Sequence, residues 1–146
     1  MSATIIDGKS IAAALRATVK AQTQALRAAH GIVPGLAVVL LGDDPASQSY
    51  VASKSRAVTE VGMRPFDHHL PASVSEAELS ALVQKLNAEP AVHGVLVQMP
   101  LTPQISTKRV VASIDPDKDV DGFHPLGGCS PACRRWRRAR RSPASS

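Results

Sequence analysis

The hydrophobic positions of the chain follow two different spacings. Between residues 7 and 30, apolar or small side chains recur at the spacing of a helix. Residues 35–42 instead form an unbroken apolar run bounded by glycines, which is typical of a strand buried on both faces of a parallel sheet. Continued along the chain, the two patterns predict helices over residues 7–30, 45–61, 75–86 and 107–113, and strands over residues 35–42, 63–70 and 92–97.

Local start and stop signals support these helices. Gly31 is a natural C-terminal stop, and Asp44 offers an N-cap oxygen directly before a proline. Ser75 and Glu78 have the spacing of a capping box. Because strands and helices alternate, the expected fold is a three-layer α/β domain with a parallel sheet and right-handed crossovers. Ligands bind beyond the carboxyl ends of such strands, which points to residues 42–44 and 98–101.

The size and composition of the chain are those of a globular domain. Its 146 residues are 44% hydrophobic and 20% charged, so a packed core is expected and global disorder is not. No apolar run approaches the roughly 18 residues of a membrane-spanning helix, and the first residues show no signal-peptide pattern. We therefore expect a cytoplasmic protein that does not associate with membranes.

The formal net charge of +5 is concentrated at the end of the chain. Six of the 17 Lys and Arg residues follow Cys133, and the rest of the chain carries 11 basic and 12 acidic groups. We expect a folded domain over residues 1–126 and a basic, irregular tail over residues 127–146. The two cysteines, Cys129 and Cys133, supply at most half of a metal site. The tail is either an arm that binds nucleic-acid phosphates or an accident of translation.

One charged side chain lies in line with apolar positions of the second predicted helix. Tyr50, Lys54, Val58 and Val61 recur on one face. Lys54 is either a lysine whose stem packs while its amine reaches water, or a partly desolvated amine at a cleft where it can transfer protons. Tyr50 is equally compatible with a core position and with stacking on an aromatic ligand.

Two further polar residues lie where a ligand is expected. Gln98 directly follows the last apolar run, so it is either an edge residue or a ligand contact at the end of a strand. Asp121 lies in an acidic loop and is compatible with a simple turn position. His68, His69 and His93 lack the spacing of metal ligands and are interpreted as structural.

Three segments, in order, resemble the signatures of one enzyme family. Residues 43–54 are similar to the Tyr-Val-x-x-Lys signature of bifunctional methylenetetrahydrofolate dehydrogenase/methenyltetrahydrofolate cyclohydrolases, the FolD family. Residues 94–101 and 116–125 resemble its second and third signatures, and residues 6–9 fit its usual opening. The resemblance covers residues 5–126, and three long signatures in order are far more specific than one short motif.

The resemblance implies a role for each matched residue. Lys54 would transfer protons, chiefly in the cyclohydrolase step, and Tyr50 would pack on the folate ring system. Gln98 would hydrogen-bond to Lys54 and orient it. Asp121 would accept hydrogen bonds from the amino group and ring nitrogen of the pterin.

The resemblance also implies a reaction, a cofactor and partners. Such enzymes oxidise 5,10-methylenetetrahydrofolate to 5,10-methenyltetrahydrofolate with NADP, and hydrolyse the product to 10-formyltetrahydrofolate for one-carbon metabolism and purine biosynthesis. Pro100 and Leu101 would form part of the wall of the folate cleft. The implied partners are tetrahydrofolate derivatives and a second copy of the chain, because the family forms homodimers; nucleic acid is not an expected partner.

The likeness ends after about Leu126, where the family continues into a Rossmann-like NADP-binding domain. We expect that domain and most of the dimer contacts to be missing, so that the chain has little dehydrogenase activity and at most weak cyclohydrolase activity. If the codons of the tail are read in a shifted frame from about Gly128, permitted codon choices encode a Pro-Cys-Thr-Pro segment found in the family. The tail is therefore interpreted as out-of-frame translation. The alternatives are an inactive folate-binding fragment and a nucleic-acid-associating fragment with a basic tail.

Overall fold

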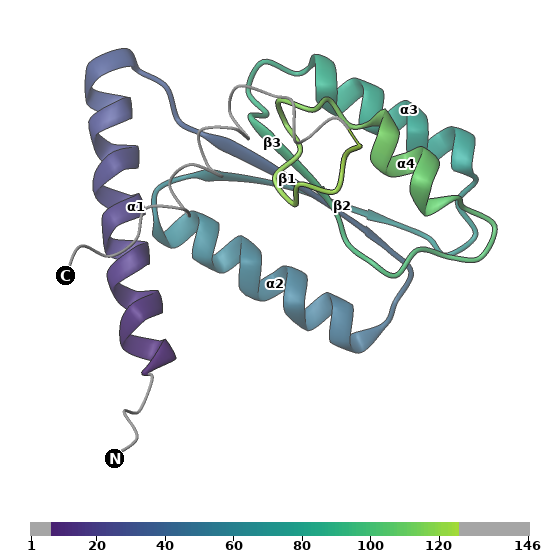
Figure 1. Ribbon diagram of the computed structural model, residues 1–146, viewed down its shortest axis with the longest axis horizontal. Helices are drawn as coiled ribbons and strands as arrows, with labels where there is room; N and C mark the ends of the chain where they lie inside the picture. Colours follow the sequence, from purple (N-terminus) through teal and green to yellow (C-terminus); the bar gives the residue numbers. More distant parts are fainter. Residues whose placement is uncertain (1–6, 126–146) are drawn as a thin grey trace.

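Seven helices and strands follow one another in residues 7–125, the part of the chain that the computed structural model describes (Figure 1). Each predicted element is present, with ends that differ from the expected ones by no more than two residues. In chain order they are α1 (Gly8–His30), β1 (Gly35–Leu41), α2 (Pro45–Glu60), β2 (Arg64–Leu70), α3 (Glu76–Ala88), β3 (Gly94–Val97) and α4 (Thr107–Ser113).

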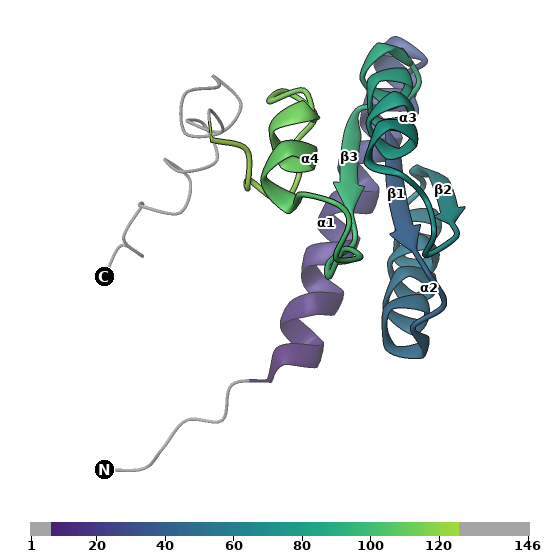
Figure 2. The same ribbon diagram turned by 90° about the vertical axis from the view of Figure 1, so that its right-hand side faces the viewer.

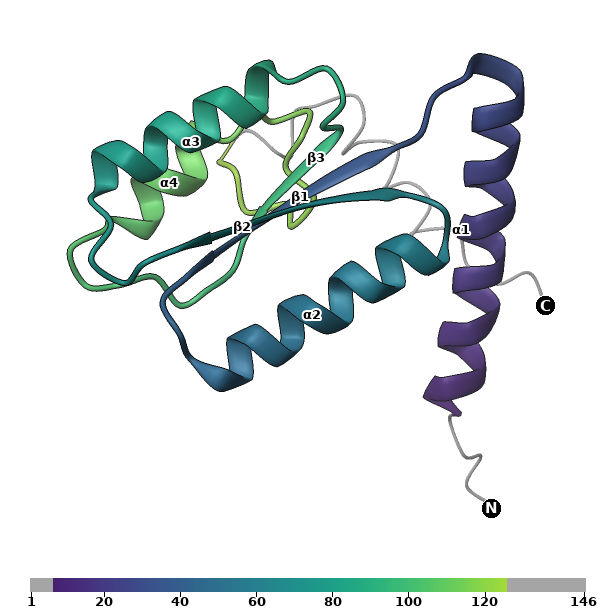
Figure 3. The same cartoon turned by 180° about the vertical axis from the view of Figure 1, so that it is seen from behind.

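The three strands form a parallel sheet in the order β2-β1-β3, and their arrows point the same way in Figure 2. Strand β1 is central: Gly35 pairs with Arg64 at one end of β2, and Val39 pairs with Val97 at the end of β3. Helix α2 covers one face of the sheet, and α3 and α4 cover the other (Figures 1 and 3). The structure therefore has the predicted three layers, and the carboxyl ends of β1 and β3 lie side by side.

Side-chain caps fix where two of the helices begin. Asp44 accepts a 2.8 Å hydrogen bond from the backbone N–H of Ser47, and this bond lowers the pKa of Asp44. Ser75 and Glu78 form the predicted capping box, in which each side chain accepts a hydrogen bond from the backbone N–H of the other residue. The hydrogen bonds that the Ser75 hydroxyl and N–H donate to Glu78 lower the pKa of Glu78. Helix α1 ends at Gly31, whose φ of 68° suits glycine.

The larger hydrophobic core lies between the sheet and the layer of α3 and α4. Leu79, Val83 and Leu86 of α3 are buried there, together with Val39 of β1 and Val110 of α4. Leu79 has no exposed surface, so its burial contributes fully to the stability of this face.

A smaller core lies on the other face of the sheet, under α2. Val51 of α2 packs there against Val38, Leu40 and Leu96. Helix α2 therefore buries few of its residues, and it leaves polar and aromatic side chains near the end of the sheet.

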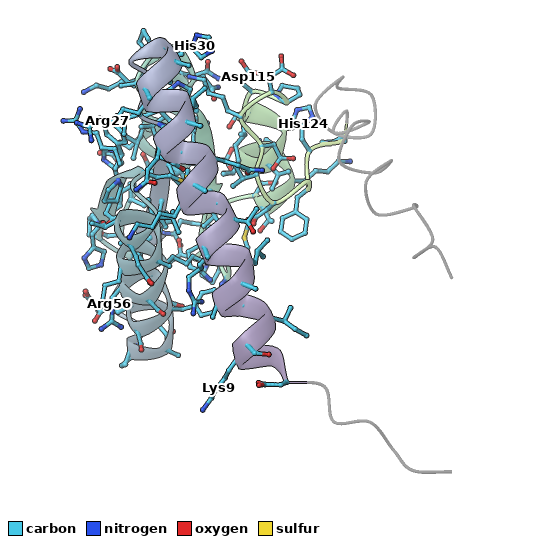
Figure 4. All side chains as sticks on the ribbon, turned by 90° about the vertical axis from the view of Figure 1, so that its left-hand side faces the viewer. Lys9, Arg27, His30, Arg56, Asp115 and His124 are labelled. Atoms are coloured by element: carbon cyan, nitrogen blue, oxygen red, sulfur yellow. The ribbon has the colours of Figure 1, made fainter. Side chains whose placement is uncertain are left out.

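Helix α1 lies beside the C-terminal end of α2 and is mostly solvated. Its exposed side chains include Lys9, Arg27 and His30, labelled in Figure 4, and Ile11 and Leu15 are 59% and 63% exposed. Within the described residues its contacts with α2 include the ion pair of 3.9 Å between Arg16 and Glu60. Neither α1 nor any other helix of residues 7–125 combines the length and the apolar character needed to cross a membrane.

The segment after α4 folds back beside β3. The backbone N–H of Val95 donates a 2.7 Å hydrogen bond to the carbonyl of Lys118, and Val95 forms an isolated parallel bridge with Asp119. This close approach requires a glycine at position 94, because a Cβ there would lie 2.5 Å from Cγ1 of Val120. The strand and the loop that carries Asp121 are therefore held in direct contact.

Candidate active site

Lys54 and Gln98 come together from different elements of the fold. Lys54 lies on α2, which follows β1, and Gln98 directly follows the neighbouring strand β3. The half-buried ammonium of Lys54 donates a 3.2 Å hydrogen bond from Nζ to Oε1 of Gln98. The hydrogen bond expected between these two side chains is therefore present, at the carboxyl ends of the strands.

The amide of Gln98 is fixed in orientation. Its Nε2 donates a 2.9 Å hydrogen bond to the carbonyl of Met99, and its backbone N–H donates to the carbonyl of Val39 at 2.8 Å. Because the amide nitrogen is already engaged, the oxygen is the atom that faces Lys54. Gln98 therefore presents a preoriented acceptor and is not a free edge residue.

Tyr50 is not a core residue. Its side chain is 58% exposed, and the ammonium of Lys54 lies 4.5 Å from the centre of its ring. At this distance the ring face attracts the cation, and the remaining ring surface is open to solvent. The exposed position favours the stacking role over the alternative of a core aromatic.

The two residues expected in the cleft wall have different surroundings. Pro100 is exposed, whereas Leu101 is half-buried and packs against the larger hydrophobic core. Leu101 therefore helps to anchor the segment that follows Gln98, and the contact of either residue with a folate stays a prediction.

Asp121 faces the same region from the loop that follows α4. Asp121 is an exposed residue, but partial desolvation by its neighbours raises the pKa of its carboxyl above the ordinary value. The ammonium of Lys54 acts in the opposite direction and favours the carboxylate, while the charge of Asp119 raises the pKa further. The structure thus couples Asp121 to Lys54 electrostatically.

A narrow recess of about 10 Å³, with room for about one water molecule, lies beside Asp121 and is lined by β3, Met99, α4 and Phe123. A broader, mostly apolar hollow of about 430 Å³ shares Met99 and Phe123 with it and lies along α4. Apolar walls with a few polar groups at the rim are typical of sites for flat organic ligands.

Asp119, which shapes this loop, was not among the residues predicted from the sequence. The two carboxylate oxygens of Asp119 accept hydrogen bonds from the backbone N–H groups of Gly122, at 3.1 Å, and His124, at 2.9 Å. An aspartate three residues before a glycine is a recognisable turn signal, and it was available in the sequence. Asp119 therefore organises the backbone on both sides of Asp121.

Two of the histidines contact backbone groups, as expected of structural residues. Nδ1 of His93 accepts a 3.1 Å hydrogen bond from the N–H of Gly35, and Nε2 of His69 lies 2.7 Å from the carbonyl of Gly42. Within residues 7–125 no group of three or more His, Cys, Asp or Glu residues could hold a metal ion. Cys129, Cys133 and the rest of the basic tail lie outside the described residues.

The sequence matches a family described as tetrahydrofolate dehydrogenase/cyclohydrolase, catalytic domain, over residues 6–121. It is 57% identical over 126 residues to the bifunctional protein FolD of Rhodopseudomonas palustris strain HaA2, covering 86% of this chain and 43% of that protein. It is 61% identical over 122 residues to the bifunctional protein FolD 3 of Rhizorhabdus wittichii, covering 84% and 40%. The chain thus spans less than half the length of these relatives.

Solved structures show the same fold. The bifunctional FolD enzyme of Campylobacter jejuni superposes with a TM-score of 0.82 at 44% identity, covering 84% of this chain and 43% of that one. The Trypanosoma brucei methylenetetrahydrofolate dehydrogenase-cyclohydrolase, solved with NADP and an inhibitor, gives 0.83 at 35% identity, covering 88% and 44%. Because the family pattern extends over most of the chain, this protein belongs to the tetrahydrofolate dehydrogenase/cyclohydrolase family.

Proposed function

We propose that this chain binds one-carbon derivatives of tetrahydrofolate beside α2 and β3, and that Lys54 transfers protons in the hydrolysis of 5,10-methenyltetrahydrofolate to 10-formyltetrahydrofolate. The observation that carries the proposal is the contact of 3.2 Å between Lys54 Nζ and Gln98 Oε1, next to the exposed ring of Tyr50. This contact supports the proposal, because a lysine suited to proton transfer, an amide acceptor and an aromatic ring then lie together near the carboxyl ends of the strands.

The hydrolysis needs two proton movements. Water adds to the carbon that bridges N5 and N10 of the methenyl cation, and Lys54, once its ammonium has released a proton to solvent, takes one proton from the adduct. The remaining hydroxyl proton moves to N5 as the bond between N5 and the one-carbon unit breaks. The aldehyde carbon stays on N10, and one proton is released overall.

Gln98 and Tyr50 orient the reacting amine. One N–H of Lys54 points to the fixed oxygen of Gln98, so the other positions on Nζ are directed away from that amide. The ring of Tyr50 lies on another side of the ammonium and offers its open surface to the folate rings. These contacts preorganise Lys54 before the substrate binds.

Asp121 completes the proposed substrate contacts. As a carboxylate it offers two acceptor oxygens, which match the adjacent amino and ring N–H donors of a pterin. The nearby ammonium of Lys54 favours this ionised form.

The described residues do not fit a dinucleotide. Asp7, Asp44 and Ser75 already cap the N-termini of α1, α2 and α3. The turn after β1 carries the acidic pair of Asp43 and Asp44, where a pyrophosphate needs free N–H groups and no negative charge. We therefore assign these three helix N-termini no part in binding NADP and derive no hydride-transfer step from residues 7–125.

NADP as oxidant, a homodimer and a cytoplasmic location are proposals that rest on the family. For a polypeptide of these 146 residues we propose little dehydrogenase turnover and weak hydrolysis, because Tyr50 in the proposed site is 58% exposed and water is poorly excluded there. NADP-dependent oxidation by the purified chain at the rate of a full-length relative would contradict this proposal.

The proposed site is tested with 5,10-methenyltetrahydrofolate, by calorimetric binding and by the loss of its absorbance during hydrolysis. Lys54→Met should lower the catalysed rate by about 10²–10⁴-fold, the usual contribution of a positioned acid–base group. The control is Lys85→Met, which removes an exposed lysine of α3 and should leave the rate unchanged. Failure of the folded parent chain to bind the compound would overturn the proposed function, and an unchanged rate in Lys54→Met would overturn the role of Lys54.

A further inference from the structure

Lys118 makes an unusual set of contacts for a lysine between two aspartates. Its Nζ donates hydrogen bonds to three backbone carbonyls at the end of α3: Leu86 at 3.1 Å, Asn87 at 2.6 Å and Glu89 at 2.9 Å. An ammonium has three N–H donors, so each of them has a partner here. The carbonyls at a helix C-terminus carry partial negative charge, which favours a cation at this place.

The backbone of Lys118 is also fixed. Its carbonyl accepts the N–H of Val95 at 2.7 Å, and its own N–H donates to the carbonyl of Asp115 at 2.8 Å. One residue therefore ties the loop to the end of α3, to strand β3 and to the segment that follows α4. No helix or strand contains this loop, so its position depends on these ties.

The fixed point lies three residues before Asp121. Between them, Asp119 accepts the N–H groups of Gly122 and His124, so the backbone from Lys118 to His124 forms one bonded turn. A displacement of Lys118 would therefore move Asp121 relative to Lys54, which lies on α2 across the site.

We propose that Lys118 is a positioning residue that acts through the loop to hold the Asp121 carboxylate in place for the pterin of the substrate. The proposal rests on the proposed function for the identity of the ligand, but the link from Lys118 to Asp121 is a property of the free chain. A lysine that served only to stabilise α3 would change the melting temperature without changing the environment of Asp121.

The test compares two variants. Lys118→Met keeps an unbranched apolar side chain but has no N–H donors. Lys85→Met removes an exposed lysine from the last turn of α3, the helix whose C-terminal carbonyls Lys118 contacts. The first measurement is the titration of the Asp121 carboxyl carbon by NMR in the ligand-free chain. In Lys118→Met the raised pKa of Asp121 should fall toward its ordinary value, because the loop no longer holds the carboxyl against its present neighbours. In Lys85→Met the titration should match the parent.

The second measurement is calorimetric binding of 5,10-methenyltetrahydrofolate. Lys118→Met should weaken binding by roughly tenfold, equivalent to about 1.4 kcal/mol, and Lys118→Arg, which keeps a charged donor, should restore part of the loss. An unchanged Asp121 titration and unchanged affinity in folded Lys118→Met would overturn the positioning role. If the parent chain itself does not bind, the proposed function fails and the Asp121 titration alone decides the role of Lys118. If Lys118→Met does not fold, Lys118→Gln is judged by the same two results.

Discussion

The two faces of the sheet differ in how many residues they bury. Among the described residues, the core between the sheet and α3 and α4 contains 13 buried residues, whereas the core under α2 contains four. Helix α3 buries a stripe that includes Leu79 and Val83. Helix α2 leaves Tyr50 exposed and Lys54 half-buried at the end of the sheet. The face under α2 is therefore less densely packed, and it leaves the side chains of Tyr50 and Lys54 accessible at the end of the sheet.

The largest expected effect tests the stabilising face. Leu79→Ala should lower the free energy of unfolding by about 2–5 kcal/mol, because it removes buried methyl groups and leaves a cavity under α3. Urea unfolding followed by circular dichroism measures the loss. A loss below about 1 kcal/mol would show that this core is not the main source of stability.

A smaller effect is expected at the start of the same helix. Ser75→Ala should cost about 1 kcal/mol, because it removes the cap on the N–H of Glu78. The matched control is Ser106→Ala at the start of α4, where the side chain makes no cap hydrogen bond. Equal losses in the two variants, measured by urea unfolding, would contradict the importance of the capping box.

The opposite face should be much less sensitive. Tyr50→Ala should change the free energy of unfolding by about 0.5 kcal/mol or less, since the ring is exposed and its contact with the ammonium of Lys54 is partly solvated. The same variant should weaken binding of 5,10-methenyltetrahydrofolate in calorimetry. A stability loss as large as that of Leu79→Ala would remove the distinction between the two faces.

The smallest expected effect is a pH dependence with a defined sign. Because the pKa of Asp121 is raised in the folded chain, the folded state holds this proton more strongly than the unfolded state. Its contribution to stability is therefore present below the ordinary pKa of 3.8 and is lost as the pH rises through the raised pKa. The contributions of the capping carboxylates of Asp44 and Glu78 to stability depend on pH in the opposite direction, because their lowered pKa values favour the folded state at higher pH.

Asp121→Asn isolates the contribution of Asp121, since asparagine does not titrate. The stability of the variant relative to the parent should increase as the pH rises through that window, measured by urea unfolding at a series of pH values. A difference that is independent of pH, or that has the reverse sign, would show that the carboxyl is not held in a partly desolvated place.

The sequence predicted the helix boundaries well because local signals set them. Asp44, Ser75 and Gly31 each act through hydrogen bonds or backbone angles within a few residues. The start of β3 was predicted two residues early. The apolar run begins at Val92, but the N–H of Val92 donates to the carbonyl of Glu89 in a turn; the first hydrogen bond to β1 is made by the N–H of His93, and β3 begins at Gly94.

The site was predictable only in part. The contact of Lys54 with Gln98 was expected from the family resemblance, whereas the rule for parallel strands by itself points only to the segments that follow β1 and β3. The three carbonyls around Lys118 could not be predicted, because only the folded chain brings the end of α3 to that loop. The apolar spacing of α1 predicted a helix, but it did not show that Ile11 and Leu15 would be exposed.

The missing side chain at Gly94 affects how mutational surveys of this protein should be interpreted. Even alanine at this position would press on the side chains of Val120 and Leu36, and these side chains would have to move beside the turn that bears Asp121. In a screen for the proposed folate binding, a substitution at position 94 that disturbs this turn would score as a loss, although residue 94 does not line the recess beside Asp121. A list of positions at which substitution abolishes binding would therefore include residues that do not contact the ligand.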